Sequence, residues 1–150
     1  GKGIRTTVEN HGLFFQDSDR VEELLLTVAH PNFGLLADMG NFLCVDEAPD
    51  QAFARVAQYA FYVHAKDFHV KSAEAARTDE VGFRSRNGNL LKGAIIGEGD
   101  VPVLRCLEEL KSAGYRGCIA IEFEGEQEPA PGIAAGLANL KKYLKRAGLA

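Results

Sequence analysis

The sequence predicts an α/β fold in which parallel strands alternate with helices. Four short runs of β-branched or apolar residues recur along the chain, and each is followed by a polar turn. Segments with the apolar spacing of amphipathic helices separate these runs and also follow the last of them. Strands that alternate with helices lie parallel, because each helix returns the chain to the end of the sheet from which it started.

The first two units are short and regular. We expect the first strand at residues 4–8 and its helix at residues 18–28, with Asp17 or Ser18 as the N-cap. The second strand is expected at residues 34–38. Its helix should cover residues 49–59, because proline is well suited to the first helical turn and Pro49 stands there.

The last two units are separated by a longer segment. Strands are expected at residues 61–66 and 118–123. A helix should precede the latter, capped by Asp100 and closed by Gly114, and a final helix should cover residues 133–147. The excursion at residues 70–99 contains Asn87-Gly88, a typical hairpin turn. Such a long connection after a strand carries function, or else is an ordered decoration that covers the core.

Two architectures fit four such units in one domain of residues 1–150. One is a small open sheet, and the other is half of a (β/α)8 barrel, whose usual length is about 250 residues. A half barrel leaves two strand edges and an apolar face uncovered. We therefore expect a partner, either a second copy in a homodimer or a missing N-terminal half, with the first and fourth strands near the seam.

Composition excludes several classes of protein. Hydrophobic residues make up 46% of the chain and charged residues 25%, as in an ordinary globular domain. The net charge of −4 argues against nucleic acid as a partner, and no apolar run has the length of a membrane span. The three cysteines are widely spaced, which favours reduced thiols and a cytoplasmic location.

Metal-ligand side chains stand at or near the C-terminal ends of all four predicted strands. They are Glu9, Asp38, His64 and Glu122. In parallel α/β folds these strand ends converge on the active face. Alone, each residue is more often a cap, a turn residue or a structural histidine, but the coincidence at four strands favours one site. Converging carboxylates need a cation, so we expect one divalent metal ion: Mn2+, Mg2+, Co2+ or Zn2+.

Further polar residues near these ends are candidates for substrate binding. Lys66 shares a strand face with His64 and could hold a substrate oxygen, or could only form a salt bridge. His11 and His69 could contact substrate or serve as structural residues. Glu124 shares a face with Glu122 and is a weaker candidate for the same ligand position.

The chain resembles a known enzyme family through five motifs in a fixed order. They are VENHG, LLADMGNF, VHAKDFH, IGEGDV and IAIEFEGEQEP. In this order they resemble the C-terminal half of the sugar phosphate isomerase/epimerase family, the xylose isomerase-like TIM barrels. The resemblance implies a (βα)4 half barrel without the first four strands, with Glu9, Asp38, His64 and Glu122 as metal ligands. Asn41 stands where epimerase members often carry a substrate-binding histidine, and we place it in the substrate site.

The resemblance implies an enzyme of carbohydrate metabolism that handles a small sugar-like substrate. We expect a metal-dependent isomerase or epimerase of a sugar, sugar phosphate or related keto-polyol, acting through an enediolate. Glu9 and Glu122 would be the catalytic proton carriers from opposite sides of the site. The alternatives are an inosose-type dehydratase, a phosphodiesterase of the endonuclease IV type, and a half barrel that is catalytically incomplete.

Overall fold

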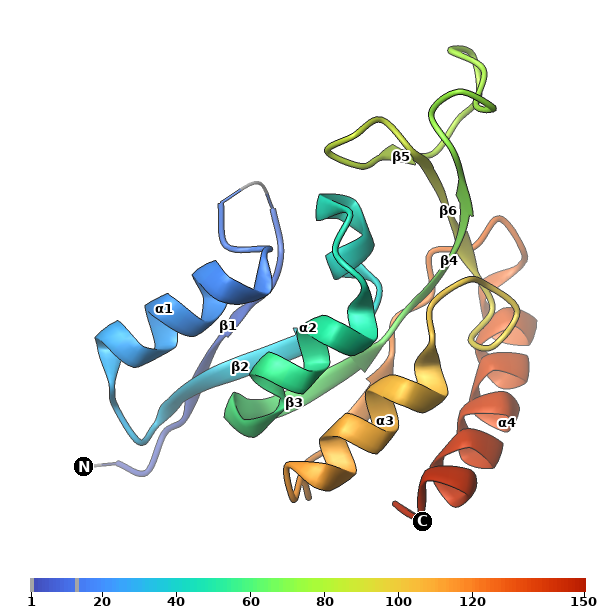
Figure 1. Cartoon of the computed structure of the whole chain (residues 1–150). Coiled ribbons are helices and arrows are strands. Elements are labelled where there is room, and N and C mark those ends of the chain that lie inside the picture. The colour runs from blue at the N-terminus through green and yellow to red at the C-terminus, as the bar shows by residue number, and fades with distance from the viewer. Residues whose placement is uncertain (1, 13) are drawn as a thin grey trace.

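Four parallel strands form the main sheet in a computed structural model that describes residues 2–12 and 14–150 (Figure 1). The strands are β1 (Thr6–Glu9), β2 (Phe33–Asp38), β3 (Ala60–Ala65) and β7 (Ile119–Ile121). They lie in the order β1-β2-β3-β7, and every neighbouring pair is parallel. Their C-terminal ends therefore share one edge of the sheet, as the alternating pattern predicted.

Helices cover one face of this sheet. They are α1 (Ser18–Val28), α2 (Pro49–Val56), α3 (Val103–Ser112) and α4 (Pro129–Ala147), packed side by side in chain order (Figure 1). A short 3-10 helix, η2 (Ala57–Tyr59), continues α2. No helix of the described residues is both long enough and apolar enough to cross a membrane.

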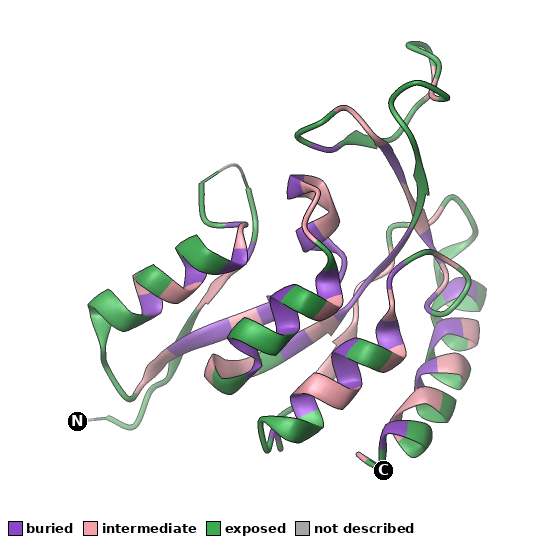
Figure 2. Cartoon of the chain, viewed as in Figure 1, coloured by how far each residue is buried: buried purple, intermediate pink, exposed green. Residues whose placement is uncertain are grey.

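The hydrophobic core lies between the sheet and its helices. Leu35 and Ala37 of β2, and Val63 and Ala65 of β3, are fully buried and alternate along their strands. Figure 2 shows buried residues along these strands and along the helices packed on them. The intervening residues point to the opposite face, where Tyr62 is 37% exposed. One covered face and one open face are what half of a barrel presents, so the predicted (βα)4 fold is confirmed.

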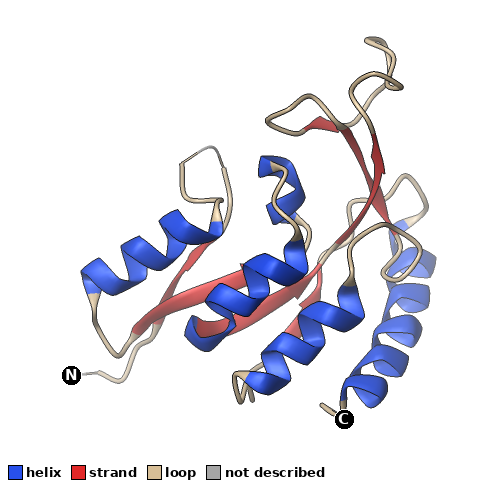
Figure 3. Ribbon diagram, viewed as in Figure 1, coloured by secondary structure: helices blue, strands red, loops and turns tan. Residues whose placement is uncertain are grey.

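The excursion after β3 folds into a small antiparallel sheet that rises from the C-terminal edge (Figure 3). Its strands are β4 (Asp67–Lys71), β5 (Phe83–Arg84) and β6 (Leu90–Ala94), in the order β4-β6-β5. The predicted hairpin turn lies between β5 and β6. Gly88 has a φ of 86° there, and its N–H donates to the Ser85 carbonyl at 2.9 Å.

Two expected helix caps differ in the structure. Asp17 stands at the predicted N-cap position of α1, which begins at Ser18, but its side chain makes no capping hydrogen bond, because its carboxylate pairs with Arg86. Glu47 takes that place and accepts the Ser18 N–H at 2.9 Å. Asp100 does not cap α3 either, since the helix begins at Val103 and Asp100 accepts the Val70 N–H at 2.7 Å.

Several element bounds also differ from expectation. Strand β1 covers Thr6–Glu9 instead of residues 4–8, and α4 begins four residues earlier than expected, at Pro129. Pro49 opens α2 as predicted. Gly114 and Gly148 lie in the left-handed region, with φ of 73° and 70°, at the ends of α3 and α4.

Candidate metal centre

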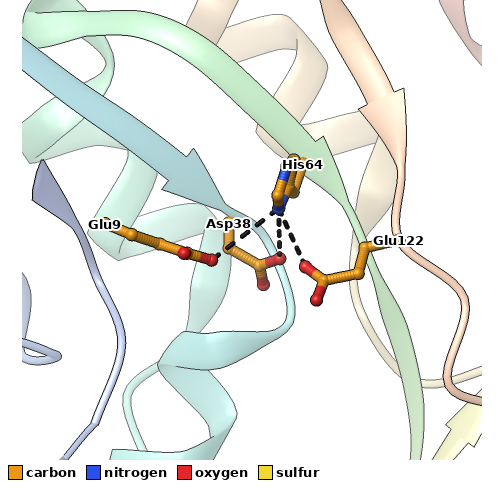
Figure 4. Close-up of side chains that lie close together, drawn as sticks. All are labelled: Glu9, Asp38, His64 and Glu122. Carbon is orange, nitrogen blue, oxygen red and sulfur yellow. Dashed lines mark hydrogen bonds and ion pairs between the residues drawn. The ribbon is translucent and has the colours of Figure 1, made fainter. Parts of the chain in front are cut away.

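Four side chains from four strands meet at the C-terminal edge of the sheet (Figure 4). They are Glu9, Asp38, His64 and Glu122, and one potential ligand atom of each lies within 4.8 Å of the others. Nδ1 of His64 lies 2.8 Å from Oε2 of Glu122. It is 3.7 Å from Oε1 of Glu9 and 3.7 Å from Oδ2 of Asp38. The structure thus brings together the residues that the strand-end pattern selected.

Strand register explains this convergence. Asp38 pairs with His64 across β2 and β3, so their side chains point to the same, open face. Glu122 follows the last residue of β7, and its N–H donates to the Ala65 carbonyl at 3.0 Å. Glu9 is the last residue of β1. Each ligand candidate therefore stands on or next to a paired strand, which fixes its backbone.

Asn10 fixes the position of Asp38, a role that no sequence pattern indicated. Its side-chain amide donates to the Asp38 carbonyl at 3.0 Å and accepts the Asp38 N–H at 2.8 Å. Asn10 is fully buried, so these bonds are shielded from water. Only the spacing of β1 and β2 in three dimensions places Asn10 beside Asp38.

Only one oxygen of the Asp38 carboxylate accepts a hydrogen bond from the described residues. Oδ1 accepts the Asn41 N–H at 2.8 Å, whereas Oδ2 is buried and has no hydrogen-bond partner among the described residues. Burial raises the pKa of Asp38 well above its usual range; the positive charge of Lys66 opposes the rise and Glu122 adds to it. A buried oxygen without a partner is costly and needs an explanation. A cation at the centre of the cluster supplies one.

Lys66 is a buried cation beside the cluster. Its side chain is 3% exposed, and its Nζ lies 3.2 Å from Oε2 of Glu122 and 3.6 Å from Oε2 of Glu124. Burial would lower the pKa of Lys66, but nearby carboxylates, with Asp38 the strongest, outweigh it and raise the pKa. Glu124 contacts Lys66 but stands outside the four-residue cluster, so Glu122 is the better placed of the two.

Glu122 is poised as an ionised carboxylate. Partial burial would raise its pKa, but the neighbouring Asp38 carboxyl group and the charge of Lys66 together lower it. The pKa values of the two neighbouring carboxyl groups are thus pushed apart. Asp38 holds a proton more readily, and Glu122 is more readily ionised. Groups whose surroundings push their pKa values apart are common at catalytic sites.

Asn41 links three members of the site and belongs to η1 (Asn41–Val45), a 3-10 helix that follows β2. Besides the bond from its N–H to Asp38, its amide oxygen accepts from Lys66 Nζ at 3.2 Å. Its amide nitrogen lies 3.4 Å from Oε1 of Glu9. Asn41 therefore holds side chains in place, and substrate contact by Asn41 stays a prediction.

The other histidines lie apart from the cluster. His11 lines a pocket of about 250 Å³ next to Lys66 and Asn41, whereas His69 is exposed on β4 opposite Lys92 and does not line that pocket. His64 is the one histidine of the described residues in the cluster. A multi-histidine, multi-metal centre of the phosphodiesterase type is therefore not formed by this part of the chain.

Asp67 fixes the loop that precedes α3. Its buried carboxylate accepts four backbone N–H groups at 2.8–3.0 Å, from Phe68, Gly97, Gly99 and Val101. Because Asp67 directly follows Lys66, this cradle also anchors the backbone that carries the buried lysine. Three of these four donors, Gly97, Gly99 and Val101, belong to the motif IGEGDV, but the motif itself did not indicate the acceptor that they surround.

The donor set fits a divalent ion. Three carboxylates and one imidazole suit Mg2+, Mn2+, Co2+ or Zn2+. Oδ2 of Asp38 points into the cluster, 3.7 Å from Nδ1 of His64 (Figure 4). The residues that would hold the ion are Glu9, Asp38, His64 and Glu122.

A parallel half barrel with a potential metal-binding cluster at its strand ends defines the class of protein. Residues 1–143 match the model of one family, the xylose isomerase-like TIM barrels. The chain therefore belongs to that family, as its ordered motifs indicated.

Known proteins similar to this chain are roughly twice its length or longer. Rhizopine catabolism protein MocC of Rhizobium meliloti is 29% identical over 129 residues, which are 85% of this chain and 38% of that protein. A xylose isomerase-like TIM barrel protein from Mycobacterium smegmatis, solved in complex with magnesium, has a TM-score of 0.74 at 19% identity. The match covers 97% of this chain and 45% of that one.

A D-tagatose 3-epimerase-like protein has a TM-score of 0.70 at 22% identity, and the match covers 97% of this chain and 49% of that one. Epimerases and dehydratases both occur among the matching structures. At these identities the likeness shows a shared fold.

Proposed function

We propose that this chain carries the catalytic site of a divalent-metal-dependent isomerase or epimerase. Its substrate would be a sugar, a sugar phosphate or a related keto-polyol, converted through an enediolate. The observation that carries this proposal is the buried Oδ2 of Asp38, which accepts no hydrogen bond from the part of the chain that the structure describes and lies inside a cluster of three carboxylates and one histidine. The family supports the same class of chemistry.

A divalent ion in this cluster would polarise a substrate carbonyl and stabilise negative charge on its oxygen. The protein's own part is proton transfer. Glu122 stays ionised beside Lys66 and can therefore accept the proton on the carbon next to the carbonyl. Glu9 approaches from β1, at the other edge of the sheet, and can return a proton to the opposite face. Lys66 adds a fixed positive charge near the developing oxyanion.

Epimerisation, isomerisation and dehydration share this first step. The decisive assay is therefore exchange of the substrate's α-hydrogen with deuterated water, measured by NMR across a panel of ketoses with Mn2+ present. Glu122→Gln keeps the shape of the side chain but removes the base, so exchange should fall by at least about 100-fold. It should also weaken Mn2+ binding, because a carboxylate ligand is lost.

Glu126→Gln is the matched control. Glu126 follows on the same segment, pairs with Lys92 at 3.5 Å and belongs neither to the cluster nor to the pocket beside it, so this variant should keep most of the exchange activity and its affinity for Mn2+. Full activity in Glu122→Gln, or equal losses in both variants, would contradict the proposed role of Glu122.

We also propose that a second half barrel covers the open face of the sheet. The chain spans about half the length of the solved structures that it matches, and exposed apolar side chains line both flanks. They are Leu26 and Val28 on α1 and Ile133 and Leu137 on α4. The partner is a preceding segment of a longer chain or a second copy of this one.

A further inference from the structure

The excursion after β3 bends back over the site, and the proposed proton transfer makes no use of it. Its turn, between β5 and β6, lies above η1 (Figure 1). We call residues 83–89 the strap. They include β5 and the turn, and they reach from the excursion sheet to the elements that carry Asn41 and the start of α1.

Asp46 holds one side of the strap. It ends η1 in the left-handed region, with a φ of 59°. Its carboxylate accepts the Asn87 N–H at 2.7 Å and the Asn89 side-chain amide at 2.8 Å. The N–H of Arg86 donates to the Cys44 carbonyl of η1 at 2.9 Å. These three bonds bind the turn to η1.

An ion pair holds the strap to a second element. The Arg86 guanidinium makes two parallel bonds to the Asp17 carboxylate, at 2.6 and 2.8 Å. This contact spans 69 residues of sequence, so it fixes the tertiary position of the strap. Bidentate geometry makes it more specific than an ordinary surface ion pair.

The strap forms one wall of the pocket beside the metal cluster. That pocket, of about 250 Å³, is lined by Phe83 and Arg84 of the strap and by Lys66, Asn41 and Glu124 of the site. The Phe83 ring is 51% exposed and packs edge-on against the buried Phe68, with ring centroids 5.9 Å apart. An apolar ring thus stands across the pocket from the polar site.

The Arg84 guanidinium forms hydrogen bonds within the excursion. It donates to the carbonyl of Arg77 at 2.6 Å and to that of Gly88 at 3.3 Å. These bonds stiffen the strap against its own sheet. The pocket wall is therefore preorganised, and the Phe83 ring is the part of the strap left free for contact with a ligand.

We propose that the docked strap closes one side of the substrate pocket and presents Phe83 to the substrate. The proposal rests on the proposed function for the identity of the pocket, but docking itself can be tested without a substrate. Cys44 lines the same pocket, is partly buried and lies directly under the strap. Its alkylation rate therefore reports how often the strap undocks.

The other two cysteines calibrate this measurement. Cys118 is exposed and Cys106 is buried, so they mark the fast and slow limits of labelling by iodoacetamide, followed by peptide mass spectrometry. Asp46→Gly removes the carboxylate while tolerating the left-handed backbone, and Arg86→Ala removes the ion pair. We expect Cys44 to react about tenfold faster in each variant, because local opening becomes more frequent.

Arg77→Ala is the matched control. Arg77 also forms a two-bond pair in the excursion, with Asp79, but this pair is exposed and does not reach η1 or α1. Its loss should leave the Cys44 rate unchanged. Equal Cys44 rates in all variants, or equal acceleration in the control, would overturn the proposal.

Binding of Mn2+ alone separates this proposal from the proposed function. The strap contributes none of the four cluster residues, so Asp46→Gly should bind Mn2+ with the affinity of the parent protein. If the parent protein binds no Mn2+, the metal centre is refuted, while the Cys44 rates still decide whether the strap docks.

Discussion

Two buried aspartates show how differently the same side chain is used. Asp67 is saturated, because four N–H groups surround its two oxygens. Asp38 is equally inaccessible but leaves Oδ2 without a partner among the described residues. A carboxylate buried for structure alone is normally satisfied. The contrast supports the proposed ligand role of Asp38, whereas the carboxylate of Asp67 holds the backbone of a loop.

The four cluster residues could be selected from the sequence, whereas the residues that hold their surroundings in place could not. Glu9, Asp38, His64 and Glu122 could be selected because each stands at or near the end of a recognisable strand. Asn10 and Glu47 could not, because their roles depend on contacts with residues 28 and 29 positions away. Local pattern identifies strand ends, but it does not say which side chains meet across them.

At the scale of elements, the regular units were predictable and the connections were not. The alternation of strand-like and helix-like segments predicted that the main strands are parallel. Asn87-Gly88 predicted the hairpin turn between β5 and β6. The caps at the helix starts were harder to predict. Asp17 pairs with the distant Arg86 instead of capping α1, and Asp100 accepts a strand N–H, that of Val70, instead of capping α3. Tertiary partners outcompeted the local caps.

The packing of the loop before α3 around Asp67 can be tested by a single substitution. A Cβ on Gly99 would lie 2.2 Å from Oδ1 of Asp67, so Gly99→Ala must push the loop off its acceptor. We expect a loss of about 1–3 kcal/mol in the free energy of unfolding, the usual cost of overpacking. Urea denaturation followed by circular dichroism measures it.

Gly136→Ala is the control for that substitution. A Cβ at this position in α4 meets only ordinary contacts, the nearest at 3.4 Å on Ile96, and alanine favours a helix over glycine by about 0.5–1 kcal/mol. This variant should be as stable as the parent or slightly more so. A Gly99→Ala variant of unchanged stability would show that the cradle is looser than its distances indicate.

At the scale of the whole molecule, the covered face of the sheet is a complete core and the open face is not. Edge strands β1 and β7 have unpaired outer sides within the described chain, and Tyr62 is exposed between them. Unpaired edges invite pairing. We expect the 150-residue chain by itself to associate, so its solution mass from light scattering should be about twice 16.3 kDa.

A monodisperse monomer at high concentration would contradict a second copy as the partner. It would also show that the open face tolerates water by itself. Extending the chain with a preceding (βα)4 segment would then be the remaining way to close the barrel.

The proposed metal centre, in which Glu9, Asp38, His64 and Glu122 hold one divalent ion, can be tested by calorimetric titration of the metal-free protein with Mn2+. We predict one ion per chain. Asp38→Asn should weaken binding by more than about 100-fold, beyond the cost of losing a supporting group. No binding by the parent, or undiminished binding by Asp38→Asn, would refute this metal centre.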